Sequence, residues 1–311
     1  MLELSVGHNG RYDFYSIQEA LNQVPYGTKA LIRVKKGLYR EKLFCDKKDI
    51  TLLGEGPEET VITFSEGAYE MLPEGRKRGT FRSYTAFFSG KRVHLAHLGI
   101  KNEAGDGRTV GQSVALYLDV RQSILEDIHL YSHQDTLFLA PLPEKEREVD
   151  GFLGPRCFSR RVSAEVLVKN SVIQGDIDFI FGGADALFDS CTLVSLNRGE
   201  KINGYVAAPC GKKEERGLVF YRCNFCSEGC SAESVYLMRP WRPEGKATFL
   251  CCTYGEHINR LGVSPWSGKE DEHSYTFAEF DSHSSFPLER KTPASLLEEK
   301  AAFSLLASFS K

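Results

Sequence analysis

The stretch KNSVIQGDIDFIFGGADALFDSCTLVS (residues 169–195) decides the fold class, because it holds two short apolar segments of the same kind. Residues 169–175 and 189–195 each place small or polar residues before a few strand-favouring ones. Neither segment is long enough to bury its own apolar face. Segments of the same kind recur at 96–102, 126–132, 221–227 and 250–256.

The spacing of these segments indicates how they pack. Their central apolar residues are Ile100, Leu130, Ile173, Leu193, Phe225 and Tyr254, at intervals of 30, 43, 20, 32 and 29 residues. Short units that cannot bury a core alone do so by stacking on each other. The pattern predicts an all-β protein built as a parallel β-helix. A β-sandwich is the alternative, but it favours hairpins about 8–12 residues apart.

Further strands and two helices are expected towards the ends of the chain. Residues 30–43 and 49–56 have short alternating patterns bounded by Gly and charged residues. A short helix that caps the N-terminal end is expected from Ser16, with Tyr15, Ile17, Ala20, Leu21 and Val24 on one face and Pro25 at its end. A C-terminal helix is expected over 294–308, opened by Pro293.

Composition excludes several functional classes. The 311 residues carry a net charge of −3 and are 41% hydrophobic, so no basic surface for nucleic acid is indicated. No apolar run approaches the roughly 20 residues of a membrane span. Nine cysteines form no regular disulfide framework, and the N-terminus does not resemble a secretory signal. We expect one domain over 1–311, a monomer, and a cytoplasmic location, or secretion if residue 1 is not the native start.

Two segments bring carboxylates into apolar company. Asp135 follows Gln134 in SHQDTLFL (132–139), and Asp178 lies between Ile177 and Phe179. A carboxyl in such surroundings loses hydration, and its pKa rises unless a cation or hydrogen bonds compensate. For either Asp taken alone, a solvated turn or cap residue is the favoured explanation. Arg239, in YLMRPWRP (236–243), is a candidate for the compensating cation, and Trp241 for a flat face that stacks on sugars.

Together these segments resemble the pectin methylesterase family. The resemblance rests on GQSVAL (111–116), QDTL (134–137), DFIFGGADALF (178–188) and RPW (239–241), which occur in the order of the family's active-site blocks. Weaker similarity extends from 15–25 through 34–43, 52–56 and 79–88 to the Pro-Trp pair at 265–266, and so covers most of the chain.

The resemblance implies a right-handed parallel β-helix that hydrolyses methyl esters of galacturonate units in pectin or oligogalacturonides. It assigns Asp178 as nucleophile, Asp135 as general acid and base, and Gln134 and Gln112 as oxyanion donors. Arg239 would orient the nucleophile. The residues expected to contact substrate are Trp241, Phe179 and Thr80. No metal or other cofactor is required. The alternatives are a β-helix esterase or thioesterase acting on another substrate, and a non-catalytic carbohydrate-binding β-helix.

The spacing of the two aspartates departs from the family pattern. Asp135 and Asp178 are 43 residues apart, about twice the family's gap, because APLPEKEREVDGFLGPRCFSRR (140–161) interrupts the blocks. We interpret it as an inserted loop and expect it to overhang the cleft near Asp135. The cysteines at 223, 226, 230, 251 and 252 suggest a metal site, but strand residues three apart point to opposite faces, so we favour core packing.

Overall fold

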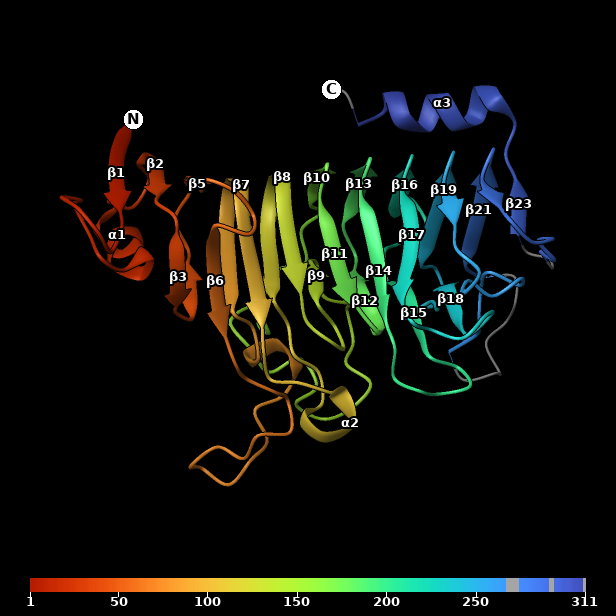
Figure 1. Ribbon diagram of the computed structural model, residues 1–311, viewed down its shortest axis with the longest axis horizontal. Helices are drawn as coiled ribbons and strands as arrows, with labels where there is room; N and C mark the ends of the chain where they lie inside the picture. Colours follow the sequence, from red (N-terminus) through yellow and green to blue (C-terminus); the bar gives the residue numbers. More distant parts are fainter. Residues whose placement is uncertain (267–273, 291–293, 310–311) are drawn as a thin grey trace.

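The computed structural model describes residues 1–266, 274–290 and 294–309, with no side-chain description at 294 and 295. Its strands run parallel and stack along the long axis of the molecule (Figure 1). They form one 23-stranded sheet whose pairings group into three ladders. The long strands β7 (Ala86–Asn102) and β8 (Leu116–Tyr131) contribute to all three ladders. The predicted parallel β-helix is therefore confirmed.

The remaining strands divide among the ladders as follows. The first ladder adds β1 (Leu2–Val6), β2 (Lys29–Val34), β5 (Asp49–Leu53), β10 (Glu165–Lys169), β13 (Asp185–Asp189), β16 (Leu218–Tyr221), β19 (Lys246–Leu250), β21 (Thr276–Phe280) and β23 (Ala294–Leu296). The second adds β3 (Gly37–Arg40), β6 (Thr60–Phe64), β11 (Val172–Gly175), β14 (Thr192–Leu196), β17 (Asn224–Glu228), β20 (Thr253–Tyr254) and β22 (His283–Ser284). The third adds β4 (Leu43–Cys45), β9 (Leu137–Leu139), β12 (Ile177–Gly182), β15 (Gly204–Pro209) and β18 (Val235–Met238).

The register of the second ladder is the one that the sequence spacing predicts. Six residues pair in succession across it: Ile100, Leu130, Ile173, Leu193, Phe225 and Tyr254. All six are buried in the main core. The irregular intervals between them are absorbed by loops outside the ladders, and the longest interval contains the insertion.

A left-handed backbone residue marks most turns from the first ladder to the second. Seven of these turns carry such a residue, with φ between 48° and 58°: His97, Asp127, Asn170, Ser190, Arg222, Cys251 and Asp281. A single residue in this conformation bends a strand without a long loop, and it is uncommon outside Gly, Asn and Asp. The turns therefore stack in line, and they keep successive coils in register.

The N-terminal helix forms where the sequence predicts it, but its cap has an additional partner. Helix α1 spans Ile17–Gln23, and the Ser16 hydroxyl accepts a hydrogen bond from the Glu19 backbone N–H at 3.3 Å. The Glu41 carboxylate accepts from the backbone N–H groups of Ile17 and Gln18. Tyr15 is 65% exposed, so its predicted place on the buried face was wrong. It precedes the cap residue, where the chain is not yet helical.

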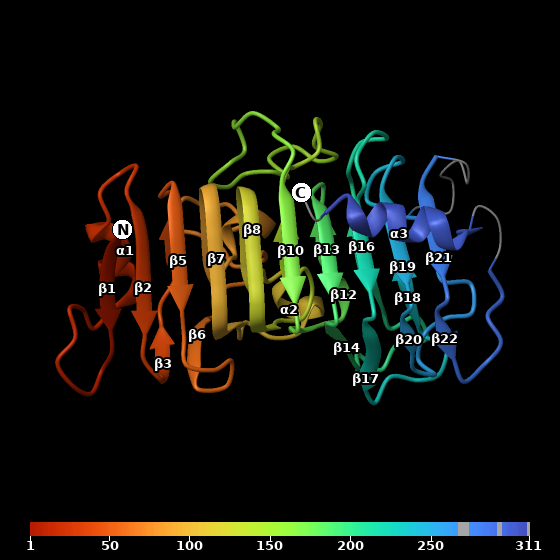
Figure 2. The same cartoon turned by 90° about the horizontal axis from the view of Figure 1, so that it is seen from above.

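The C-terminal helix begins later than predicted. Residues 294–296 form β23, which pairs with β21, and helix α3 spans Glu299–Ala307. In this segment the backbone pairs with β21, and this pairing is favoured over the helix that the periodicity predicts. Pro293, the predicted start of the helix, lies outside the described residues. Helix α3 packs along the outer face of the first ladder (Figures 1 and 2), where Ala302 contacts the cluster of Leu187, Val219 and Leu250.

The predicted core packing holds for two of the five cysteines that suggested a metal site. Cys223 and Cys252 are buried in the main core, and their thiols lie within hydrogen-bonding distance of backbone carbonyls. Cys226, Cys230 and Cys251 are only half-buried. Within the described ranges, no three His, Cys, Asp or Glu side chains are grouped as metal ligands would be. No helix in those ranges is long and apolar enough to cross a membrane.

A stack of phenylalanines supports the C-terminal half of the core. The ring centroids of Phe188 and Phe220 are 4.7 Å apart, and those of Phe220 and Phe249 are 4.9 Å apart, with nearly parallel planes. We expect Phe220→Ala to lower the free energy of unfolding by about 3–5 kcal/mol, because it leaves a cavity between two rings. Urea unfolding followed by circular dichroism measures this loss.

Phe158→Ala is the matched control for that measurement. The Phe158 side chain is 98% exposed, so the same truncation removes almost no buried surface. A Phe220→Ala variant as stable as Phe158→Ala would contradict the role given to the stack.

Candidate active site

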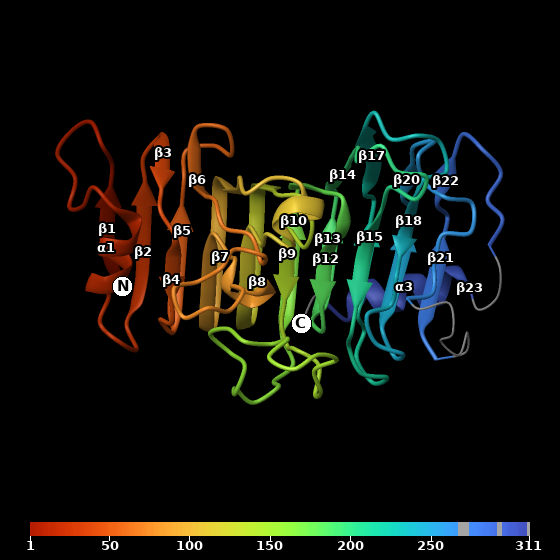
Figure 3. The ribbon, with the colours of Figure 1, turned by 90° about the horizontal axis from the view of Figure 1, so that it is seen from below.

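A cavity of about 260 Å³ lies over the outer face of the third ladder. The strands of this ladder are seen side by side in Figure 3, with the green inserted loop projecting from one edge. Loops that enter the ladder contribute Thr80, Gln112 and Gln134 to the cavity, and loops that leave it contribute Trp241 and Arg242. The floor holds Asp135, Asp178, Phe181, Ala208 and Arg239.

Asp178 and Arg239 form a two-point ion pair in this floor. The Arg239 Nε donates to Oδ1 of Asp178 at 3.1 Å, and its Nη2 donates to Oδ2. Asp178 is 4% exposed. Burial raises the pKa of the Asp178 carboxyl above its ordinary value, while the charge and hydrogen bonds of Arg239 oppose that rise. The arrangement favours an ionised, oriented carboxylate with little water around it.

The Arg239 guanidinium is itself held by aromatic rings. Its Cζ lies 3.9 Å from the ring centroid of Tyr205 and 4.1 Å from that of Trp266. Stacking on π faces stabilises a cation that has lost part of its hydration. Trp266 belongs to the Pro-Trp pair noted in the sequence, whereas Tyr205 was missed, because nothing in its segment signals proximity to Arg239.

Asp135 lies in the same cavity but in a different electrostatic setting. It is 8% exposed, and no cation in the described part of the chain donates a hydrogen bond to it. Burial raises the pKa of Asp135 well above its ordinary value, and the neighbouring charge of Asp178 raises it further. Two carboxyls with separated pKa values can divide the roles of acid and nucleophile.

Both carboxyls are presented by strained backbone. Asp135 has φ of 68° and Asp178 has φ of 49°, and neither lies at the turns between the first and second ladders. The pairing of β12 with β15 shifts register between Ile177 and Ile180, next to Asp178. Such positions cost about 1–3 kcal/mol each and concentrate at functional sites. The irregularity turns the Asp178 side chain outward into the cavity.

The same irregularity corrects the expectation for Phe179. Both Phe179 and Ile180 point into the main core and are fully buried, so Phe179 has no surface with which to contact a substrate. Phe181 faces the cavity in its place. Simple strand alternation would put Phe179 and Phe181 on one face, but the register shift at Asp178 changes the phase of the strand.

The two amides and Thr80 occupy one side of the cavity, as the sequence predicts. Gln112 and Gln134 both line it and are half-buried. A Cβ added to Gly107, in helix α2 (Gly107–Val110), would lie 2.9 Å from the Gln134 Oε1, so the helix packs closely against that amide. Thr80 opens the 3₁₀ helix η1 (Thr80–Arg82) at the rim.

Trp241 closes the opposite side within a second aromatic cluster. Its ring lies 5.9 Å from that of Phe181 and 6.0 Å from that of Phe152, both edge-on. Phe81, Phe138 and Tyr117 extend this cluster beneath the cavity. Phe81 and Phe152 also line the site and were missed as site residues, although Phe81 belongs to the 79–88 block that the sequence singled out.

The inserted loop reaches the cavity, so the prediction that it overhangs the cleft near Asp135 is confirmed. Four of its residues line the same cavity as Asp135: Arg147, Glu148, Gly151 and Phe152. The chain forms no helix or strand between Leu139 and Glu165, all of which are described. The loop connects β9 of the third ladder to β10 of the first.

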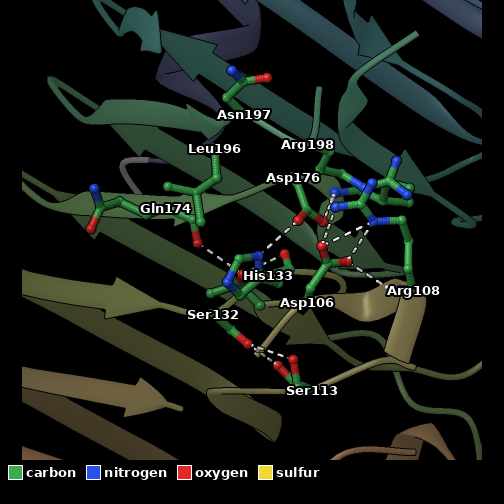
Figure 4. A network of polar contacts seen from close by, with 12 residues as sticks. Asp106, Arg108, Ser113, Ser132, His133, Gln174, Asp176, Leu196, Asn197 and Arg198 are labelled. Atoms are coloured by element: carbon green, nitrogen blue, oxygen red, sulfur yellow. Dashed lines mark hydrogen bonds and ion pairs between the residues drawn. The ribbon is translucent and has the colours of Figure 1, made fainter. Parts of the chain in front are cut away.

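His133, which the sequence left without a role, belongs to a polar network behind the site (Figure 4). Its Nδ1 lies 3.0 Å from the Oδ2 of the buried Asp176, and the Ile177 backbone N–H donates to Asp176 Oδ1. The hydrogen bond to Asp176 raises the pKa of His133. His133 does not line the cavity. The network fixes the turn that carries Gln134 and Asp135 against the strand that carries Asp178.

Comparisons with known proteins agree on one family. The model of the Pectinesterase family matches residues 3–143 and 162–287, and leaves 144–161 unmatched between them. Probable pectinesterase/pectinesterase inhibitor 23 of Arabidopsis thaliana is 29% identical over 275 residues, which cover 85% of this chain but only 43% of that protein. Pectinesterase 31 of the same plant is 28% identical over 285 residues, covering 88% of this chain and 80% of that protein.

A solved structure supports the same assignment. Pectin methylesterase PemA from Erwinia chrysanthemi superposes with a TM-score of 0.78 at 25% sequence identity. The superposition covers 98% of this chain and 95% of that chain. The similarity therefore includes the whole β-helix and the coils that carry the cavity.

Proposed function

The chain belongs to the pectinesterase family, and on that premise we propose that it hydrolyses the methyl esters of galacturonate units in pectin or oligogalacturonides, releasing methanol. The observation that carries the proposal is the fork of Arg239 on Asp178 beside a buried Asp135 that forms no ion pair with any described residue. This combination supplies an ionised nucleophile and a protonated acid in one cavity, without a metal ion in any of the steps below.

In the first half of the reaction, Asp178 is the nucleophile. One of its oxygens attacks the ester carbonyl carbon, and the carbonyl oxygen becomes an oxyanion that accepts hydrogen bonds from the amides of Gln112 and Gln134. When the carbon–oxygen bond to the methoxy group breaks, Asp135 donates its proton to that oxygen and methanol leaves. The uronate is then joined to Asp178 as an anhydride, and Asp135 is ionised.

In the second half, Asp135 acts as the base. It takes a proton from a water molecule, and the resulting hydroxide attacks the uronate carbonyl carbon. The same two amides hold the second oxyanion. The bond to Asp178 then breaks, which restores its carboxylate beside Arg239, and Asp135 is again protonated. Trp241 and Phe181 supply apolar surface on which a sugar ring can stack.

The two carboxyls predict a bell-shaped dependence of kcat/KM on pH. Activity is lost on the acid side as Asp178 takes up a proton, and because burial raises its pKa this limb lies above the ordinary range of an aspartate. Activity is lost on the alkaline side as Asp135 loses its proton, and the pKa of Asp135 is raised more than that of Asp178. Methanol release measured across pH tests this. A rate that stays constant while Asp178 titrates would contradict its role.

A panel of esters tests the substrate class. Methylated oligogalacturonides, methylated pectin, an acetylated sugar and an acyl thioester are compared at equal concentration. We expect turnover of the methylated uronides only, because the cavity combines an anion-compensating arginine with sugar-stacking rings. Turnover confined to the thioester would favour the alternative β-helix esterase, and binding of the uronides without turnover would favour a carbohydrate-binding protein.

We also propose that residues 1–311 form one domain that acts in a reducing compartment such as the cytoplasm. The single sheet supports the first point. The second is supported by nine cysteines that are all free thiols. Partially degraded oligomers, rather than intact polymer, are the substrate form expected there.

A further inference from the structure

The part of the inserted loop that the family model leaves unmatched, residues 144–161, is attached to the site by specific contacts. Phe152 is buried between Phe81 and Trp241, with ring centroids 5.9 Å and 6.0 Å away. A Cβ added to Gly154 would lie 2.7 Å from the Phe81 backbone oxygen, so the loop backbone lies directly on the aromatic cluster. Arg156 Nε donates to Asp119 on β8 at 2.6 Å. These contacts fix the loop at the rim of the cavity.

The loop brings a second arginine beside one from the RPWRP segment. Arg147 Nη2 and Arg242 Nη1 both donate to the backbone oxygen of Trp241, each at 2.9 Å. Two guanidinium groups on one carbonyl oxygen are close neighbours of like charge. Arg242 also donates to the Lys145 oxygen at 2.8 Å, and the Arg147 Cζ lies 5.0 Å from the ring centroid of Trp266. Both side chains are thus held in fixed positions.

This pair has no carboxylate partner among the residues that the structure describes. Neither Arg147 nor Arg242 makes an ion pair there, and Glu148, which lines the same cavity, pairs with neither. Burial, together with the charge of Arg147, lowers the pKa of Arg242. Placing like charges together is unfavourable unless an anion completes the arrangement. Both residues line the cavity that holds Asp178, so such an anion would adjoin the reacting ester.

We propose that Arg147 and Arg242 form a carboxylate-binding subsite for a free galacturonate unit adjacent to the methyl ester being hydrolysed. The proposal rests on the proposed function, and it deepens it by naming the substrate pattern. Arginine binds carboxylates through two parallel hydrogen bonds, and each group keeps N–H donors beyond those given to backbone oxygens. The cavity is smaller than the about 300–1,000 Å³ of most ligand sites, so it suits the esterified uronate, with the adjacent free unit at the rim beside Arg147 and Arg242.

The expected consequence is a preference for partly de-esterified substrates. Wild-type kcat/KM should be about 10-fold higher for an oligogalacturonide with a free carboxylate beside the methyl ester than for the fully methylated oligomer of equal length. Residues 144–161 lie outside the matched family pattern, so the contribution of Arg147 to this preference would be particular to this chain.

Arg147→Gln tests the subsite directly. The Gln amide can still donate to the Trp241 oxygen, so the loop keeps its attachment while the charge is lost. We expect the variant to lose about 10-fold in kcat/KM on the partly de-esterified oligomer, mainly through KM, and to change less than about 2-fold on the fully methylated one. Arg147→Lys should retain part of the preference, since it keeps the charge without the fork.

Arg160→Gln is the matched control, because Arg160 is an exposed residue of the same loop that does not line the cavity. Equal losses in Arg147→Gln and Arg160→Gln, or an unchanged substrate preference in Arg147→Gln, would overturn the proposal. Calorimetric binding of fully demethylated trigalacturonate separates this result from failure of the proposed function. A wild-type protein that binds it about 10-fold more tightly than Arg147→Gln, in a salt-dependent way, but releases no methanol would refute the activity alone.

Discussion

Asp178→Asn should lower kcat for methanol release by roughly 10⁴-fold or more, because the amide cannot form the covalent acyl intermediate. The replacement keeps the size of the side chain and leaves an oxygen that can accept one hydrogen bond from Arg239. It also leaves a largely buried guanidinium without its counter-charge, so a lower midpoint of thermal unfolding is expected as well. Methanol release and thermal unfolding are therefore measured on the same preparation.

Asp127→Asn separates loss of the nucleophile from the general effect of this substitution. Asp127 has φ of 50°, close to that of Asp178, but it lies half-buried at a turn between the first and second ladders, where it contacts His97 and not the cavity. Asn tolerates this backbone conformation. Near-wild-type activity is expected for Asp127→Asn. If Asp178→Asn kept more than about a tenth of the wild-type rate in a folded state, Asp178 would not be the nucleophile.

Asp135→Asn should lower kcat by about 10²–10⁴-fold, the contribution typical of general acid–base catalysis. Methoxide would then leave without a proton, and water would attack the acyl intermediate without a base. The residual activity of the variant should show no alkaline limb in its pH profile, because the group that causes this limb is gone. An alkaline limb that survives unchanged in Asp135→Asn would assign that limb to another residue.

The same variant is expected to be at least as stable as the wild type at neutral pH. Burial raises the pKa of Asp135 in the folded protein, whereas an Asp in the unfolded chain has a pKa near about 3.9. The folded state therefore binds the proton more tightly, and stability falls as pH rises from that value through the folded-state pKa. Asn removes this cost. Unfolding by urea at pH 5 and pH 8 measures it, and a less stable variant at pH 8 would contradict the setting described for Asp135.

The stacking of coils could be read from the sequence because it depends on spacing alone. Each central apolar residue from Ile100 to Tyr254 follows a left-handed turn residue by three positions, so one pattern fixes both the turn and the register. The N-terminal helix was predictable for a similar reason, since the Ser16 cap is a local feature. Its second cap partner, Glu41, comes from another coil and has no local signal.

The site was predictable as a set of residues but not in its geometry. Gln112, Gln134, Asp135, Asp178, Arg239, Trp241 and Thr80 line one cavity, as their order along the chain suggested. The exchange of Phe179 for Phe181 follows from a register shift that strand alternation does not reveal. The late start of α3 also has a cause outside local periodicity, because β23 gains backbone hydrogen bonds from β21 on the preceding coil.

The proximity of Arg147 and Arg242 could not be predicted from the sequence. Arg147 and Arg242 are 95 residues apart, and only the folded loop brings both to the Trp241 oxygen. Composition marked residues 140–161 as an insertion, yet charge, Pro and Gly content carry no information on which side chain faces the cavity. That information comes from packing of Phe152 and Gly154 on the aromatic cluster.

The most direct test of the central claim is the stoichiometry of hydrolysis by the wild-type protein on a methylated oligogalacturonide of defined length. Methanol is measured enzymatically while new acid is titrated at constant pH. We predict one methanol for each carboxylate formed, with both lost in Asp178→Asn. A folded wild-type protein that releases neither product from any methylated uronide would contradict the claim.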